Sequence, residues 1–324
     1  MKVVIPGGSG QVGALLERAF TAAGHTVAVL TRGPKRPVEV GWDGRTLGAW
    51  AGEVDGCDVV VNLAGRSVSC RYTPANLREM MDSRVSSARV VGQAIAEARR
   101  PPKVWLQAST ATIYAHTFGA AHDEDGVIGG TERGVPGYWA YSVEIAKRWE
   151  REQAEAATPH TRKVALRSAM VMSPDRAGVF DYLSWMARLG LGGPVAGGRQ
   201  YVSWIHYRDF VRAVEFLIAH DELDGPVNLA APGPLPQRDF MRELRHGWGM
   251  PIGLPATRTM AAVGAFALRS DTELLLKSRR VVPGRLPDAG FTFEYGDWHA
   301  AARDLVRRTR AQRSRQRGPA RNEP

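Results

Sequence analysis

Cysteine is scarce in this chain of 324 residues, which contains only Cys57 and Cys70. Two cysteines are too few for a disulfide framework, and they lack the spacing of zinc ligands. The eight histidines show no metal-ligand pattern either, because His116 and His122 are too far apart in sequence to share one helical face. We therefore expect no metal site and a protein suited to the reducing cytoplasm.

Long apolar runs are also missing. The N-terminal apolar segment covers only residues 3–5 before Pro6 and Gly7, so it lacks the apolar core of a secretion signal. The longest later stretch, residues 260–268, is too short to cross a bilayer. We expect no membrane association.

Acidic residues are outnumbered, and the formal net charge is +10. From Arg303 onward, eight arginines face only Asp304 and Glu323, so this segment alone carries +6. Residues 309–324 contain almost no apolar side chain, which predicts a disordered basic tail. Such a tail could touch nucleic acid or acidic lipid, but a merely solvating role is favoured, and we expect no nucleic-acid partner.

Glycine is plentiful at the start of the chain, in the segment that organises the rest. A short apolar run at residues 3–5 leads into a turn with Gly7, Gly10 and Gly13, and apolar residues then recur at helical spacing. Strand, glycine turn and helix form the usual cradle for a dinucleotide, because bare amides at the helix N-terminus face the diphosphate. A glycine-rich turn without a ligand is the alternative.

A second predicted strand, at residues 26–30, supports the dinucleotide interpretation. It ends in Thr31 and Arg32, where an NAD site would carry an acid that binds the ribose 2′-hydroxyl. An arginine instead offers a planar fork to a 2′-phosphate. The sequence therefore favours NADP(H), although Arg32 could simply be a solvated loop charge.

Strands and helices alternate through the first half of the chain. Strands are expected near residues 38–43, 58–65, 103–109 and 162–172, and helices over 74–99 and 139–157. This alternation predicts an α/β protein with a doubly wound parallel sheet and helices on both faces. The strand that ends in Asn62, Leu63, Ala64 and Gly65 reaches the carboxyl edge, where such sheets bind ligands.

Past residue 173 the elements become shorter and richer in glycine. Helices are expected over residues 209–220, 239–248, 256–268, 271–279 and 298–308, and a strand at 226–230 returns to the sheet. We therefore divide the chain into a dinucleotide-binding domain (1–173), a smaller, mostly helical C-terminal lobe (174–306) and the basic tail (309–324).

These motifs together resemble those of the extended short-chain dehydrogenase/reductases, the epimerase/dehydratase group with a Rossmann sheet. The resemblance extends over residues 1–306 and is nearest to the atypical YfcH-like subfamily, which ends in a small domain of unassigned function. It rests on the glycine turn, the 62–65 segment, the 110–114 strand end, the segments 198–200 and 204–206, and the ending at 286–293 with the helix after it. The glycine turn and the ends of the second and fourth strands, together with this resemblance, lead us to expect NADP(H) and the following binding residues: Gly7, Gly8, Ser9, Gly10, Gln11, Val12, Gly13, Thr31, Arg32, Asn62, Leu63, Ala64 and Gly65.

The resemblance also implies a reactive centre with one part missing. Thr110 matches the residue that orients the substrate carbonyl, and Tyr141 aligns with the proton-transferring tyrosine. The family's lysine, four residues after that tyrosine, would favour the phenolate, but Ile145 stands there. Lys147 does not replace it, because six helical residues place it about 120° away from the face of Tyr141. The atypical subfamily lacks the same pair.

Other polar residues fit structural roles better. His206 and Asp209 match a segment in which the acid ties the second lobe to the sheet. Tyr114 and Trp42 could each contact a ligand, but core packing is equally consistent with the sequence. Pro6 has to be the last residue of its strand, because proline cannot donate to the ladder.

Two functions follow. The first is an NADP(H)-dependent oxidoreductase or epimerase-like enzyme that acts on a small carbonyl or alcohol, with Thr110 holding the oxygen and Tyr141 or water supplying the proton. The second is an NADP(H)-binding protein that senses redox state or stabilises a complex with little turnover. A nucleic-acid factor acting through the tail is a third, disfavoured, interpretation.

Overall fold

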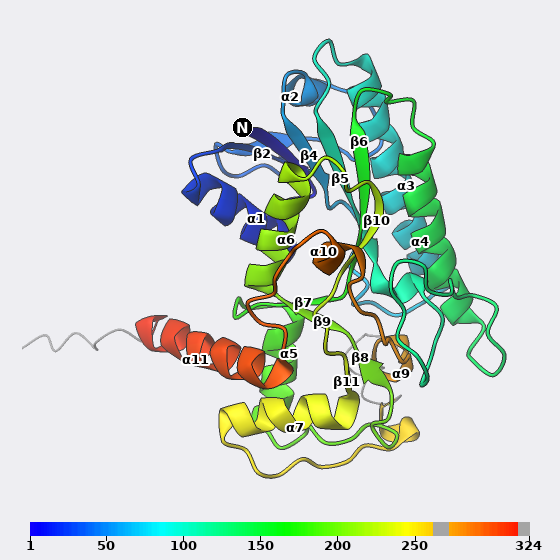
Figure 1. The fold of residues 1–324 in the computed structure, drawn as a ribbon, viewed down its shortest axis with the longest axis vertical. Coiled ribbons are helices and arrows are strands. Elements are labelled where there is room, and N and C mark those ends of the chain that lie inside the picture. The colour runs from blue at the N-terminus through cyan, green and yellow to red at the C-terminus, as the bar shows by residue number, and fades with distance from the viewer. Residues whose placement is uncertain (262–271, 317–324) are drawn as a thin grey trace, which may run out of the picture.

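The computed structural model describes residues 1–261 and 272–316. Its centre is a seven-stranded, wholly parallel sheet in the order β10-β6-β5-β4-β1-β2-β3 (Figure 1). The strands are β1 (Lys2–Pro6), β2 (Thr26–Thr31), β3 (Glu39–Gly41), β4 (Val59–Asn62), β5 (Val104–Thr110), β6 (Arg162–Ser168) and β10 (Gly225–Leu229). The predicted doubly wound α/β fold is confirmed.

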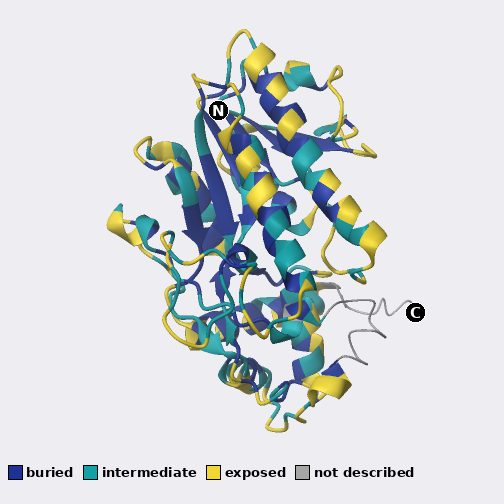
Figure 2. Cartoon of the chain, turned by 90° about the vertical axis from the view of Figure 1, so that its right-hand side faces the viewer, coloured by how far each residue is buried: buried dark blue, intermediate teal, exposed yellow. Residues whose placement is uncertain are grey.

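Helices cover both faces of this sheet because the strands are apolar on both sides. On one face, α1 (Gln11–Ala22) and α6 (Tyr207–Ala219) bury Leu16, Phe20 and Phe210 against the strands. On the other face lie α2 (Ala51–Val54), α3 (Pro74–Glu97) and α4 (Tyr138–Ala154), whose core includes Trp149. Figure 2 shows the strands buried and the outer surfaces of the long helices exposed.

The carboxyl edge of the sheet contains the topological switch. The chain runs from β1 outward to β2 and β3 and then returns to the other side of β1 as β4. Pro6 is the last residue of β1, as predicted, and its carbonyl accepts a hydrogen bond from the Leu63 amide (2.8 Å). The glycine turn and the 62–65 segment therefore lie beside each other, at the position where open α/β sheets bind ligands.

The predicted strand over residues 162–172 is wrong as a single element. Ser168 ends β6, and the chain then leaves the main sheet as β7 (Met170–Met172), which pairs with β9 (Trp204–His206). This small parallel pair joins the sheet to the C-terminal lobe. A second pair, antiparallel, consists of β8 (Tyr201–Val202) and β11 (Leu235–Pro236).

The C-terminal lobe is mainly helical. The helices α5 (Val179–Arg188), α7 (Gln237–Trp248) and α11 (Trp298–Gln316) enclose a core in which Trp298 stacks on Phe240 at 3.9 Å between ring centroids. The short helices α9 (Glu273–Leu276) and α10 (Arg285–Asp288) and the 3-10 turn η1 (Ala111–Ile113) complete the described elements. The helix expected at 256–268 lies mostly outside the described residues, and that expected at 271–279 is reduced to α9.

The prediction of a disordered tail from residue 309 is wrong as far as Gln316. Helix α11 continues without a break to that residue because its last turns have partners (Figure 1). Arg310 donates to the carbonyl of Trp248 (3.1 Å) and lies over its ring, and Arg313 pairs with Asp181 at 3.2 Å. Residues 317–324 lie outside the described part.

Candidate cofactor and reactive site

The glycine turn is shaped by close backbone contacts. Gly7 has φ +74°, and a Cβ on it would lie 2.5 Å from the Cα of Ala64. A Cβ on Gly13 would lie 2.2 Å from the carbonyl oxygen of Gly8. Only glycine fits at these two positions, so the turn packs directly against the end of β4 and against the first turn of α1.

Gly10 serves a different purpose. It is the N-cap of α1, with no side-chain cap, and a Cβ on it would have only the Gly7 carbonyl oxygen within 4 Å, at 3.8 Å. Ser9 and Gly10 are exposed, whereas the side-chain amide of Gln11 is buried against Gly178, and its Nε2 has no hydrogen-bond partner among the described residues. Bare first-turn amides and an open approach at Ser9 and Gly10 fit the diphosphate of a dinucleotide.

Arg32 follows directly on the end of β2. It is exposed, and no described residue forms a hydrogen bond or ion pair with its side chain. The neighbouring Thr31 is buried, and its hydroxyl donates to the Ser9 hydroxyl (3.3 Å), which joins the end of β2 to the glycine turn. Arg36, by contrast, is held by Glu17 and Glu39. Arg32 is therefore a cation left available beside the turn.

The end of β4 has a structural and an accessible part. Asn62 is fully buried, its amide donates to the Gln107 side chain (2.9 Å), and its Oδ1 accepts from the Ala64 amide (3.1 Å). Asn62 thus shapes the turn, whereas Gly65 is exposed. A Cβ on Gly65 would lie 3.1 Å from Arg84, a residue that sequence reasoning missed.

Arg84 lies between α3, α4 and the end of β4. It is partly exposed and donates to the carbonyl oxygens of Met80 and Arg66 (3.0 Å each), and its guanidinium lies over Trp149. Burial lowers its pKa to about 10, and no carboxylate of the described chain pairs with it. The one feature of the sequence that could have pointed to Arg84 is that it interrupts the apolar stripe of the predicted helix over residues 74–99.

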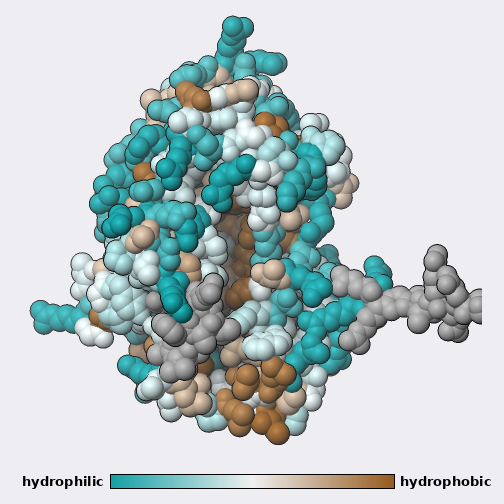
Figure 3. Space-filling model, turned by 180° about the vertical axis from the view of Figure 1, so that it is seen from behind, coloured by the Kyte–Doolittle hydropathy of each residue, from teal (hydrophilic) through white to brown (hydrophobic). Residues whose placement is uncertain are grey.

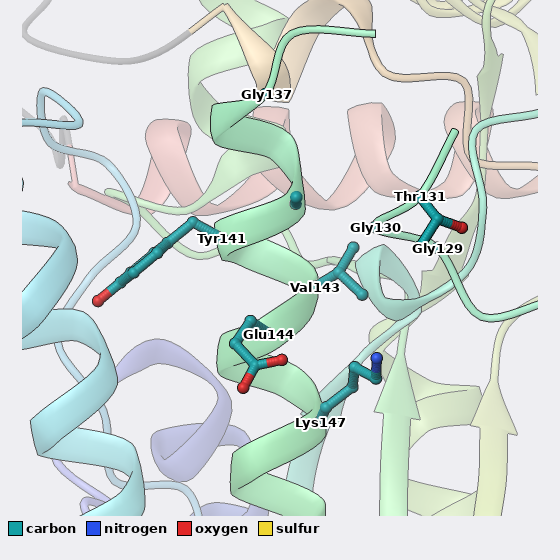
Figure 4. A pocket seen from close by; sticks show the side chains of 9 residues that line it. Gly129, Gly130, Thr131, Gly137, Tyr141, Val143, Glu144 and Lys147 are labelled. Carbon is teal, nitrogen blue, oxygen red and sulfur yellow. The ribbon is translucent and has the colours of Figure 1, made fainter. Parts of the chain in front are cut away.

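Thr110 and Tyr141 take different environments. Thr110 ends β5 half-buried, and its hydroxyl accepts from the Thr112 amide (3.1 Å) at the start of η1. Tyr141 is half-buried on α4 and packs with Ile145 against Met80 and Met81. Figure 4 shows Tyr141 pointing away from Lys147, which is exposed on another side of α4. Lys147 therefore cannot serve Tyr141, as the helical spacing predicted.

The remaining candidates are structural. The Tyr114 hydroxyl is buried, donates to Asn228 (2.8 Å) and accepts from Arg167 (2.9 Å), and Trp42 packs edge-on against Trp50. The Asp209 carboxylate accepts from the amides of Glu294 and Tyr295 (2.8 Å each), so it ties the segment before α11 to α6, which packs on the sheet.

The back of the molecule is hollowed at its centre. A vertical groove with an apolar floor opens at the centre of that face (Figure 3). A separate hollow beside α4 is lined by residues that include Gly130, Thr131, Glu144 and Lys147 (Figure 4). In the described part of the chain no cluster of His, Cys, Asp or Glu could hold a metal, and no helix is both long and apolar enough to span a membrane.

Comparison with known proteins places these features in a family. The model of the NAD dependent epimerase/dehydratase family matches residues 3–230, and a domain of unknown function, DUF1731, matches residues 262–305. The chain is 30% identical to the epimerase family protein SDR39U1 of Bos taurus over 94% of this chain and all of the relative.

Solved structures agree with this. Human epimerase family protein SDR39U1 (isoform 2), crystallised with NADPH, has a TM-score of 0.83 and 26% identity over 95% of this chain and 99% of its own. A short-chain dehydrogenase/reductase superfamily protein from Agrobacterium tumefaciens with bound NAD shares the fold alone (TM-score 0.69, 16% identity, 98% and 100% covered). This chain belongs to the NAD dependent epimerase/dehydratase family, in its form with a C-terminal DUF1731 domain.

Proposed function

We propose that this protein binds NADP(H) across the carboxyl edge of its sheet and catalyses hydride transfer to or from a small carbonyl or alcohol. The amides from Ser9 to Val12 would hold the diphosphate, and Arg32 would bind the 2′-phosphate. When bound, the nicotinamide supplies or accepts the hydride. The observation that carries the choice of cofactor is Arg32, an exposed guanidinium at the end of β2 that has no hydrogen-bond or ion-pair partner among the described residues.

The residues of the reactive end support a modest chemistry. Thr110 stands at the end of β5, where its hydroxyl would orient the substrate oxygen. Tyr141 or a water would supply the proton. General acid catalysis typically raises a reaction rate about 10²–10⁴-fold. Because no lysine stands four residues after Tyr141, we expect Tyr141 to contribute only a small part of this enhancement. The human relative that was crystallised with NADPH supports the cofactor but not a substrate.

Calorimetry of both cofactors tests the proposal. We expect Arg32→Asp to weaken NADPH about 10- to 100-fold, because a hydrogen bond between charged groups contributes about 1.5–3 kcal/mol, and to leave NADH nearly unchanged. Arg99→Asp is the matched control, since Arg99 is also exposed and precedes β5 at the opposite, amino edge of the sheet. Equal weakening of NADPH and NADH would contradict the assignment of Arg32.

A second function is favoured by one observation. Ile145 occupies the expected position of the lysine, and Tyr141 packs with it on an apolar cluster. The protein would then bind NADP(H) to sense redox state or stabilise a complex. If NADPH raises the melting temperature while no member of a carbonyl panel oxidises it, this alternative replaces the enzymatic function.

A further inference from the structure

The C-terminal domain inserts a buried cluster of charges at the reactive end. Lys277 is 3% exposed, and its ammonium donates to the carbonyl oxygen of Thr112 (2.9 Å). Arg279 donates through Nε to the hydroxyl of the same threonine (3.0 Å). Thr112 lies in η1, two residues after Thr110. Two cations of the C-terminal domain thus fix the turn that follows the predicted substrate-orienting residue.

The same domain also contacts the helix that carries the tyrosines. Glu273 accepts from the Ser142 hydroxyl (2.6 Å) and forms an ion pair with Lys277 (3.8 Å). The hydroxyls of Tyr138 and Thr272 share a hydrogen bond of 2.8 Å. Ser142 is one residue after Tyr141. It is also four residues after Tyr138, which is the spacing at which the family's lysine follows its tyrosine. Lys277 is therefore linked to α4 through Glu273 and to η1, the turn that follows β5, through Thr112.

We propose that Lys277 is a positioning residue of the reactive end, which fixes the turn after Thr110 and supplies there the positive charge that is missing from α4 four residues after Tyr141. This inference rests on the proposed NADP(H) site. A cation held without solvent at this place stabilises negative charge on a substrate oxygen. It also disfavours the oxidised nicotinamide, which carries a positive charge, relative to the reduced one.

The charge of Lys277 is itself sensitive to pH. Burial, with a contribution from Arg279, lowers the pKa of its ammonium to about 8, although Glu273 and Glu132 oppose this. His116 also faces the cluster, and burial and Lys277 lower its pKa from 6.5. Between pH 7 and 9, Lys277 is thus the member of this group expected to change its charge.

The experiment measures Kd for NADP⁺ and NADPH at pH 7 and pH 9 and takes their ratio, in which the common 2′-phosphate cancels. We expect the ratio of Kd for NADP⁺ to Kd for NADPH to be roughly three- to tenfold higher at pH 7, where Lys277 is charged, than at pH 9, where it is neutral. In Lys277→Met this dependence should vanish and the ratio should resemble that of the parent protein at pH 9. Lys163→Met is the control, because Lys163 also donates to backbone carbonyls but lies near the amino end of β6.

Glu273→Gln provides a second variant if Lys277→Met does not fold. It removes the acid that raises the pKa of Lys277, so the transition in the ratio should move to lower pH. Unchanged ratios with unchanged pH dependence in Lys277→Met or Glu273→Gln would overturn the role of Lys277 while leaving the cofactor site intact. If neither nucleotide binds the parent protein, the proposed function itself fails, and the role of Lys277 fails with it.

Discussion

Replacing Gly10 by alanine should separate cofactor binding from folding. The backbone at Gly10 has φ −78° and ψ 173°, which alanine adopts readily, and the nearest atom to a new Cβ is 3.8 Å away. Alanine is a poorer N-cap than glycine, but it also restricts the unfolded chain, so the free energy of unfolding should change by less than about 1 kcal/mol. The new methyl would stand where we expect the diphosphate to approach.

The affinity for NADPH should therefore fall about 10- to 100-fold in Gly10→Ala, which corresponds to about 1.4–2.8 kcal/mol of binding free energy. Isothermal titration calorimetry measures the affinity and urea unfolding the stability. Gly52→Ala is the control, because a Cβ there meets nothing within 4 Å on α2. Unchanged NADPH affinity in Gly10→Ala would refute the placement of the diphosphate at this turn.

Gly7→Ala should behave in the opposite way. Its φ of +74° costs an L-residue roughly 1–2 kcal/mol, and the new Cβ would lie 2.5 Å from the backbone of Ala64, which cannot move aside without separating β1 from β4. We expect a loss of more than about 3 kcal/mol in the free energy of unfolding. Comparing Gly7→Ala with Gly10→Ala thus distinguishes a glycine needed for packing from one needed for a ligand.

Three further predictions concern the C-terminal lobe. Asp209→Ala should lower the free energy of unfolding by about 2–4 kcal/mol, because two amides lose their acceptor; Asp209→Asn, which keeps one acceptor, should recover part of the loss in urea titrations. Burial lowers the pKa of His206 to about 3, although the carboxylate of Asp304 at 3.3 Å acts to raise it. Below pH 6.5 this histidine therefore takes up a proton in the unfolded chain but stays neutral in the folded protein. Stability should then fall by about 2 kcal/mol between pH 6.5 and 5, and His206→Gln should flatten that slope. Ending the chain after Arg308 should lower the melting temperature by several degrees, since it removes the contacts of Arg310 and Arg313 with Trp248 and Asp181; an unchanged melting temperature would mean that these contacts contribute nothing.

The sheet and the conformation of the glycine turn could be predicted because their signals are local. Gly7, Gly10 and Gly13 follow an apolar strand directly, and Arg32 follows the next one, so order along the chain determines order in space for parallel βαβ units. The extent of α11 could not be predicted in this way. From the sequence alone its arginines are expected to be solvent-exposed charges. In the structure Arg310 and Arg313 contact Trp248 and Asp181, which are distant in the sequence.

The contacts between the C-terminal domain and the segments around Thr110 and Tyr141 could not be predicted, for the same reason. The hydrogen bond of Lys277 to Thr112 spans 165 residues, and that of Ser142 to Glu273 spans 131. A lysine four residues after a tyrosine can be read from the sequence because one helix turn brings the two together. A lysine supplied by another domain leaves no such spacing, and within the sequence Lys277 is simply one more charge next to a run of leucines.

An absent local motif is therefore weak evidence that the chemistry is absent. Electrostatic stabilisation depends on where a charge lies relative to the reacting oxygen and on how well water is excluded, and not on which element carries the charge. Ile145 leaves α4 without a cation four residues after Tyr141, but Lys277 and Arg279 bring two to the turn after β5, and burial of Lys277 keeps its charge poorly screened. The pair of domains matched by the two family models would then act as one site, in which the C-terminal domain supplies a cation that the dinucleotide-binding domain lacks.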